Sequence, residues 1–293
     1  MSDYRDLTRR DFVRDGALGA LLVGAAASAS RVAFGAADGK SLVAIVRDEK
    51  VQDAENKVDA AVLKKMLDQA VTAVTGESSA EAAWKKLVKP EDTVGIVATG
   101  ALNKTHAELI EAVTEAIKAA GVPADKIQSV QGKKDLVAQC TALVSLPALK
   151  AHTLTGIGTV LKNYITFGSK PAREFHKENN GGIGSIWLEP AVKGKTRIII
   201  IDALRPLCAA GPQKDPKFSW NYNGLIAGTD PVALEAVALK IIMAKRKEIK
   251  GADWELTPPP LCVAAADKEY KLGTSDLAKI AIKVTGWEKD ALV

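Results

Sequence analysis

Lysine, histidine and asparagine residues gather in the middle of this chain, in a segment that could bind an anion. Residues 146–164 contain Lys150 and His152 two positions apart, and Lys162 beside Asn163 ten positions after His152. Glycines between these pairs predict a turn into a helix. Backbone N–H groups at a helix start attract negative charge. We therefore expect an anion pocket there, with Lys150 and Lys162 beside it and His152 at its rim.

Histidine supplies candidate metal ligands and proton carriers. The chain has three, His106, His152 and His176, each expected beside a helix start or a polar turn. The imidazoles of His152 and His176, with the carboxylate of Asp202 or Asp230, would suit zinc, iron or nickel. Such a site requires that these side chains approach a common point, because their spacing carries no metal signature. For His106 a capping or solvent-exposed role is favoured, although a helix start would keep its imidazole neutral.

Two aspartates are weighed in the same way. Asp202 ends the apolar run 198–201, and the end of a buried strand is where α/β sheets place ligands. Asp230 precedes Pro231, which is typical of a helix N-cap, and a ligand role for it comes second. Lys162 and Asn163 fit either the polar face of a helix or an anion-binding pair.

The elements that must position these residues alternate between strand and helix. Apolar runs of strand length occupy residues 41–46, 93–98, 127–130, 142–146, 197–202 and 225–227. Helical spacing is found at 59–75, which ends at Gly76, and at 232–247. The pairs Ser78/Glu81 and Thr105/Glu108 have the spacing of capping boxes, and residues 275–284 are expected to be helical.

This order predicts an α/β fold with a mostly parallel sheet and helices on both faces. We expect a single main domain, residues 38–293, after an N-terminal segment.

The N-terminal segment, residues 1–37, resembles a twin-arginine export signal. Arg9 and Arg10 are followed by Phe12 and then by fifteen uncharged residues, 16–30. As a helix this run would reach about 22 Å, short of the roughly 30 Å hydrocarbon core of a membrane. We therefore expect export to the periplasm through the twin-arginine machinery. Three alternatives stay open: cleavage after Ala29, cleavage after Ala37, and an uncleaved segment that anchors the protein to the membrane.

Composition narrows the function further. Of 293 residues, 40 are Lys or Arg and 35 are Asp or Glu, without a polybasic block, so nucleic acid is not an expected partner. Cys140, Cys208 and Cys262 are far apart and lie among apolar neighbours. They are expected to be buried, inert thiols, and an iron–sulfur cluster is not expected. The cofactor stays unknown, with a divalent transition metal as the candidate.

The joint order of the central motifs resembles the domain-of-unknown-function family 362. The matching residues are Pro147, Lys150 and His152; Lys162 and Asn163; Arg173 and His176; Asp202; and the helix start 230–234. The resemblance spans about residues 42–246. It transfers no established activity.

The chain also departs from this family's pattern. Val97-Ala98-Thr99 stands where the family often has Lys and Asn, residues 127–143 look abbreviated, and Glu235 replaces a usual Asp.

Two hypotheses follow from the residues. In the first, the chain is an exported metal- or anion-dependent enzyme. Its candidate catalytic residues are Lys150, His152 and His176, with Asp202, His152 and His176 as metal ligands. Lys162, Asn163 and Asp230 are then candidate cofactor-binding residues. In the second, it is a non-catalytic periplasmic binding or accessory protein for an anionic small molecule, a redox partner or a partner enzyme.

Overall fold

A mixed β-sheet organises the part of the chain that this computed structural model describes, residues 39–100 and 102–293. The predicted export signal, residues 1–37, lies outside the described residues. The strands on the main path are, in spatial order, β3 (Ile127–Ser129), β2 (Val94–Ala98), β4 (Ala142–Leu146), β7 (Thr196–Leu207), β8 (Gly224–Gly228), β1 (Ser41–Arg47) and β9 (Ile280–Gly286). Strand β8 runs antiparallel to both of its neighbours, and the other pairings on this path are parallel. The prediction of a mostly parallel α/β sheet is confirmed.

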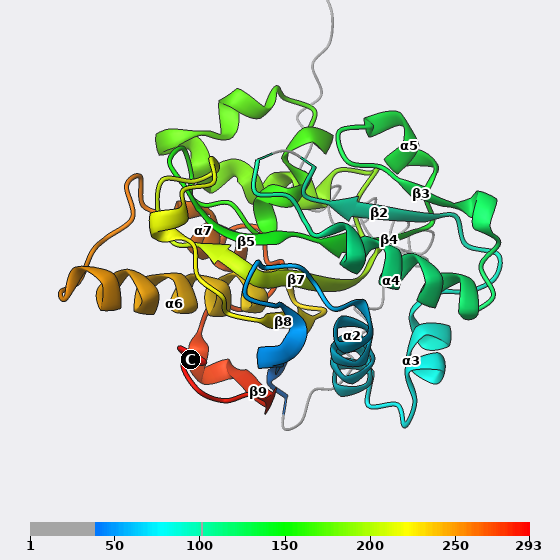
Figure 1. Cartoon of the computed structure of the whole chain (residues 1–293). Coiled ribbons are helices and arrows are strands. Elements are labelled where there is room, and N and C mark those ends of the chain that lie inside the picture. The colour runs from blue at the N-terminus through cyan, green and yellow to red at the C-terminus, as the bar shows by residue number, and fades with distance from the viewer. Residues whose placement is uncertain (1–38, 101) are drawn as a thin grey trace, which may run out of the picture. The chain divides into compact units, whose positions relative to one another are not determined.

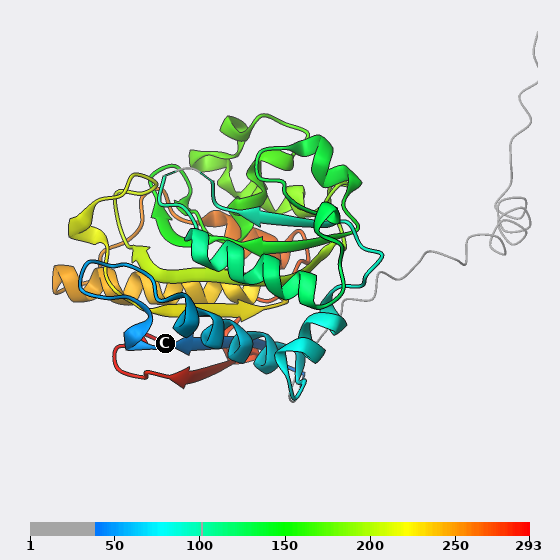
Figure 2. The same ribbon diagram turned by 45° about the vertical axis from the view of Figure 1, so that its right-hand side comes forward.

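Helices cover both faces of the sheet because the strands are apolar on both sides. In β1, Val43 and Ile45 belong to one core cluster and Ala44 and Val46 to the other, as alternation along a strand requires. One face carries α2 (Ala60–Thr75), α3 (Ala80–Leu87) and α4 (Ala107–Ala119). The other carries α6 (Pro231–Lys250), α7 (Leu261–Lys268) and the 3-10 helices Leu161–Phe167 and Lys177–Leu188, while the short α5 (Lys134–Gln139) contributes Val137. Figures 1 and 2 show α2 and α4 on one side of the strands and α6 on the other.

Capping residues set the helix ends largely as predicted. The Asp59 carboxylate accepts from the N–H groups of Ala61 and Val62 at the start of α2, and Gly76 ends that helix with a φ of 73°. Asp230 caps α6 in the same way. At each of these helix ends, a local contact supplies a hydrogen-bond partner for a backbone group that would otherwise lack one.

Three predictions about elements were wrong. Ser79, not Ser78, caps α3. Thr105 does not cap α4, because its hydroxyl donates to the carbonyl of Leu146 at 2.6 Å. Residues 275–284 are not a helix: the segment forms a short 3-10 turn and then β9, which pairs in parallel with β1. Its β-branched residues alternate along the chain and pack against the edge of the sheet, which favours a strand.

Strand β4 continues, after a break at Pro147, into β5 (Ala148–His152), which pairs with the second half of β7. A short strand, β6 (Gly156–Ile157), folds back on β5. Because β2, β4 and β7 are parallel, the loop after β2 and all of β5 lie at the carboxyl ends of these strands. That is the edge where α/β sheets bind ligands. In the described residues no helix is long and apolar enough to span a bilayer.

Candidate functional site

Lys150 and His152 lie on strand β5 itself, and the helix start expected immediately after them comes only at the 3-10 helix Leu161–Phe167. Residues two apart on a strand point to the same side, so both side chains project from one face of β5. The Lys150 backbone N–H donates to the Thr159 hydroxyl, and its carbonyl accepts from Gly158. Gly158 packs so closely on the His152 ring that a Cβ there would lie 2.9 Å from the ring carbon Cδ2.

The Lys150 side chain is 4% exposed and holds the loop that follows β2. Its ammonium donates to the carbonyls of Leu102 and Asn103 at 3.3 and 3.2 Å. These two residues have φ values of 45° and 51°, a left-handed conformation that costs free energy for side chains other than glycine. Burial and the charge of Lys162 lower the pKa of Lys150 to about 8, and the Asp202 carboxylate opposes this shift.

Lys162, His152 and His176 continue this group of bases. The Lys162 ammonium lies 3.4 Å from Nε2 of His176, and the rings of His176 and His152 stack with centroids 6.1 Å apart. Burial lowers the pKa of Lys162 to about 8. Burial and the charges of Lys162, His176 and Lys150 lower the pKa of His152 to about 3. We call Lys150, His152, Lys162 and His176 the basic cluster.

Hydrogen bonds fix the tautomers of the two imidazoles. Nδ1 of His152 accepts from the Leu154 N–H at 3.1 Å, so the proton of the neutral ring is on Nε2. Lys162 has only donors, so Nε2 of His176 accepts and its proton is on Nδ1. Burial and Lys162 lower the pKa of His176, which favours the neutral ring. The basic cluster therefore presents two ammonium groups and two imidazole N–H donors.

Asp202 pairs with His106, a contact that the sequence analysis did not predict. One carboxylate oxygen, Oδ2, accepts from the backbone N–H of His106 at 2.7 Å and faces the ring nitrogen Nδ1 at 2.8 Å. The other oxygen accepts from the Leu204 N–H. His106 is the N-cap residue of α4, as the capping alternative proposed, but its side chain makes no capping bond. The sequence does show that Asp202 ends an apolar run and that His106 precedes a helix, but β4 separates β7 from the strand before that helix, so strand order was needed to pair them.

Asn163 and Asp230 have structural contacts. The Asn163 amide donates to the Val97 carbonyl at 2.7 Å and to the Ser145 hydroxyl, which joins β2 to β4. One Asp230 oxygen caps α6, and the other accepts from the Ser41 hydroxyl and the Thr274 N–H. Their predicted part in cofactor binding stays a prediction.

The N–H groups at the start of the 3-10 helix Leu161–Phe167 do bind an anion, but it is a carboxylate of the chain. Oε2 of Glu235, from α6, accepts from the Leu161 N–H at 2.5 Å. Its other oxygen, Oε1, is buried without a hydrogen-bond partner among the described residues. Burial raises the pKa of Glu235 to about 7, although the N–H groups of Leu161, Val160 and Thr159 lower it. Glu235, noted only as a departure from the family pattern, thus supports the segment that carries Lys162.

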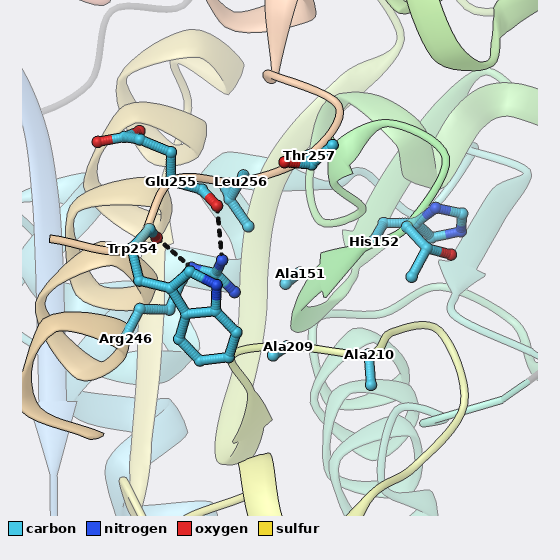
Figure 3. Close-up of a pocket in the computed structure, with 10 residues that line it drawn as sticks. Ala151, His152, Ala209, Ala210, Arg246, Trp254, Glu255, Leu256 and Thr257 are labelled. Carbon is cyan, nitrogen blue, oxygen red and sulfur yellow. Dashed lines mark hydrogen bonds between the residues drawn. The ribbon is translucent and has the colours of Figure 1, made fainter. Parts of the chain in front are cut away.

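A cavity of about 210 Å³ lies beside the end of β5, between the loops 208–211 and 254–257. Figure 3 shows His152 on one side of this cavity and Arg246 with Trp254 on the other. Arg246 donates to the carbonyls of Trp254, Glu255 and Cys208, so its guanidinium is already hydrogen-bonded. The cavity therefore gives access to one side of His152.

Metal ligands and cysteine thiols are the remaining groups that could do chemistry. Within residues 39–100 and 102–293, no group of three or more His, Cys, Asp or Glu side chains is placed to hold a metal ion. The three cysteines are free and buried, as predicted. Burial raises the pKa of each thiol, which keeps it protonated.

Comparison with known proteins supports the family resemblance. The family model described as a domain of unknown function, DUF362, matches residues 122–240. This region is shorter than the 42–246 expected from the motifs. It contains the basic cluster and Asp202, whereas His106 precedes it. No curated protein and no solved structure matches the chain.

Proposed function

We propose that this chain is an exported protein that binds a small carboxylate or phosphate anion at the basic cluster. Export rests on the twin-arginine pattern of residues 1–37. The observation that supports anion binding is that two ammonium groups and two imidazoles lie together, with Lys150 and His152 buried and Lys162 and His176 half-buried. In the described residues, none of the four makes an ion pair with a carboxylate within 4.0 Å.

Charge favours an anion over a metal ion. Unpaired buried charge is destabilising, and the lowered pKa values of Lys150 and Lys162 reflect that cost. A bound anion would offset it through charge-assisted hydrogen bonds. A divalent cation at His152 and His176 would instead face the Lys162 ammonium, 3.4 Å from Nε2 of His176.

The proposal is tested by calorimetric titration with oxalate and with inorganic phosphate at pH 7. Lys162→Met is expected to weaken binding at least tenfold, which corresponds to about 1.4 kcal/mol. Lys170→Met is the matched control, because Lys170 is exposed and outside the basic cluster. Affinity should also fall above pH 8, where Lys150 and Lys162 lose their protons.

Elemental analysis of the purified protein separates the anion from the metal hypothesis. Stoichiometric transition metal that is lost in both His152→Ala and His176→Ala would contradict the anion proposal. The proposal would also be contradicted if Lys162→Met bound oxalate and phosphate as tightly as the wild type does.

A further inference from the structure

The His106–Asp202 pair has the geometry of a side chain held for proton transfer. Asp202 is 3% exposed, and three N–H groups fix its carboxylate, two from His106 and one from Leu204. A carboxylate can only accept, so the proton of the neutral His106 ring is on Nδ1 and a lone pair is on Nε2. The side chain of His106 is 27% exposed, and Nε2 has no hydrogen-bond partner within the described ranges. The pair therefore leaves one basic nitrogen available to a ligand.

Backbone and side-chain contacts connect this pair to the basic cluster. Asp202 is the register partner of Ala148 on β5, two residues before Lys150. The Asp202 N–H donates to the Pro147 carbonyl at 2.8 Å. Lys150 in turn holds the carbonyls of Leu102 and Asn103, in the loop that leads to His106. The ammonium of Lys150 and the imidazole of His106 are thus attached to the same strand end and the same loop.

Hydrogen bonds also brace the loop itself. The Thr105 hydroxyl donates to the Leu146 carbonyl, and the Thr99 hydroxyl accepts from the Ala148 N–H at 3.1 Å. Together with the bonds from Lys150 to the carbonyls of Leu102 and Asn103, these contacts brace the described residues on both sides of position 101. A strained loop held by many contacts is typical of a functional site.

We propose that His106, oriented by Asp202, exchanges a proton with the anionic molecule bound at the basic cluster, which makes the chain a proton-transfer enzyme. This inference rests on the anion site proposed above. Nε2 of His106 would take a proton from a C–H or O–H group near the charged end of the substrate, and the electron pair of that bond would stay on the substrate. The Lys150 ammonium would stabilise the negative charge that develops. The imidazolium then returns the proton to the substrate, at the same atom or its neighbour, so no oxidant or reductant is needed.

Nitrogen NMR of ¹⁵N-histidine-labelled protein, titrated with oxalate at several pH values, tests this proposal. Three histidines give few resonances, and the spectrum of His106→Gln assigns those of His106. We expect Nδ1 of His106 to keep its proton throughout, and Nε2 to titrate. Oxalate should shift the Nε2 resonance and raise its titration midpoint by at least half a unit. In the free protein, burial and the charge of Lys214 lower the pKa of His106, whereas Asp202 and Glu108 raise it, and the net shift is upward; the bound anion would add to that shift.

The Asp202→Asn variant and the wild type separate the possible failures. Asp202→Asn should still bind oxalate, but should lose the fixed tautomer and lower the midpoint of His106. If oxalate binds the wild type and leaves the His106 resonances unchanged, the proton-transfer inference is overturned while the anion site stands. If oxalate does not bind the wild type at all, the anion site itself has failed. A His106–Asp202 pair that lies away from the bound anion would keep its resonances and its titration midpoint unchanged on addition of oxalate.

Discussion

Glu235 couples helix α6 to the segment that carries Lys162. Its carboxylate reaches from α6 to the N–H groups that precede Lys162, and it is 1% exposed. One of its oxygens has no partner within the described residues, so the ionised form is poorly compensated. The proton that it carries is therefore expected to control stability near neutral pH.

Burial raises the pKa of Glu235 from 4.5 to about 7. Between these values the folded protein keeps a proton that the unfolded chain has lost, so stability falls as pH rises. The expected loss is about 3 kcal/mol, at roughly 1.4 kcal/mol per unit. Glu235→Gln should lack this loss, and urea unfolding at pH 5 and pH 8 measures it. Wild-type and variant stabilities that change in parallel with pH would contradict the assignment.

The sequence predicts the members of the basic cluster but not the contact between His106 and Asp202. Lys150, His152, Lys162 and His176 were chosen for their types and spacing, and the structure brings these four together. His106 was given a capping or exposed role, because nothing in its neighbours shows that Asp202, ninety-six positions later, would meet it. Long-range partners of this kind depend on strand order, which local patterns do not contain.

At the scale of elements, helix α6 is fixed at its start by Asp230. One oxygen of this carboxylate caps the helix, and the other accepts from Ser41 and Thr274, on β1 and in the loop before β9. In the part of the chain that the structure describes, the side chain of Asp59, the cap of α2, makes only the helix-capping contacts. The two residues thus share one function and differ in their tertiary contacts.

Asp230→Ala is therefore expected to destabilise the fold by about 2 kcal/mol or more, and Asp59→Ala by about 1 kcal/mol. Urea denaturation of both variants measures the difference, and oxalate affinity should be unchanged in each. Equal destabilisation would show that the Ser41 and Thr274 contacts add nothing. Loss of oxalate binding in Asp230→Ala alone would instead support the predicted cofactor-binding role of this residue.

The prediction of helices succeeded where a capping residue and apolar residues at helical spacing indicate the same segment, as in α2 and α6. It failed at residues 275–284, where short-range signals favour a helix. There the edge of β1 offers backbone partners, and Ile280 and Ile282 can pack against it. The helix start expected immediately after His152 is also displaced, to Leu161, because residues 148–152 pair as β5 and residues 156–157 fold back on that strand as β6. Tertiary pairing overrides local propensity in both places.

At the scale of the whole described sheet, the C-terminal strand completes the edge beside β1. The Arg47 guanidinium lies 4.1 Å from the ring centre of Tyr222 and 4.4 Å from that of Trp287, which follows β9. Arg47 also donates to the carbonyls of Tyr222 and Lys289. Burial lowers its pKa, and these contacts offset part of the free-energy cost of burying the charge.

Trp287→Leu should therefore lower the free energy of unfolding by about 1–2 kcal/mol, through lost cation–π contact and lost apolar burial. Leu277→Ala is the control, because Leu277 is 44% exposed and its truncation should have little effect. Both are measured by chemical denaturation. A Trp287→Leu variant as stable as Leu277→Ala would mean that this contact does not hold β9.

The anion site is tested most directly by anomalous diffraction from crystals of the protein soaked in selenate. The account predicts a selenium peak within about 3–4 Å of the Lys162 ammonium and of a donor nitrogen on His152 or His176. That peak should be absent from Lys162→Met crystals and retained in Lys170→Met crystals. Selenium peaks at surface lysines alone, or a transition-metal peak between His152 and His176, would contradict the account.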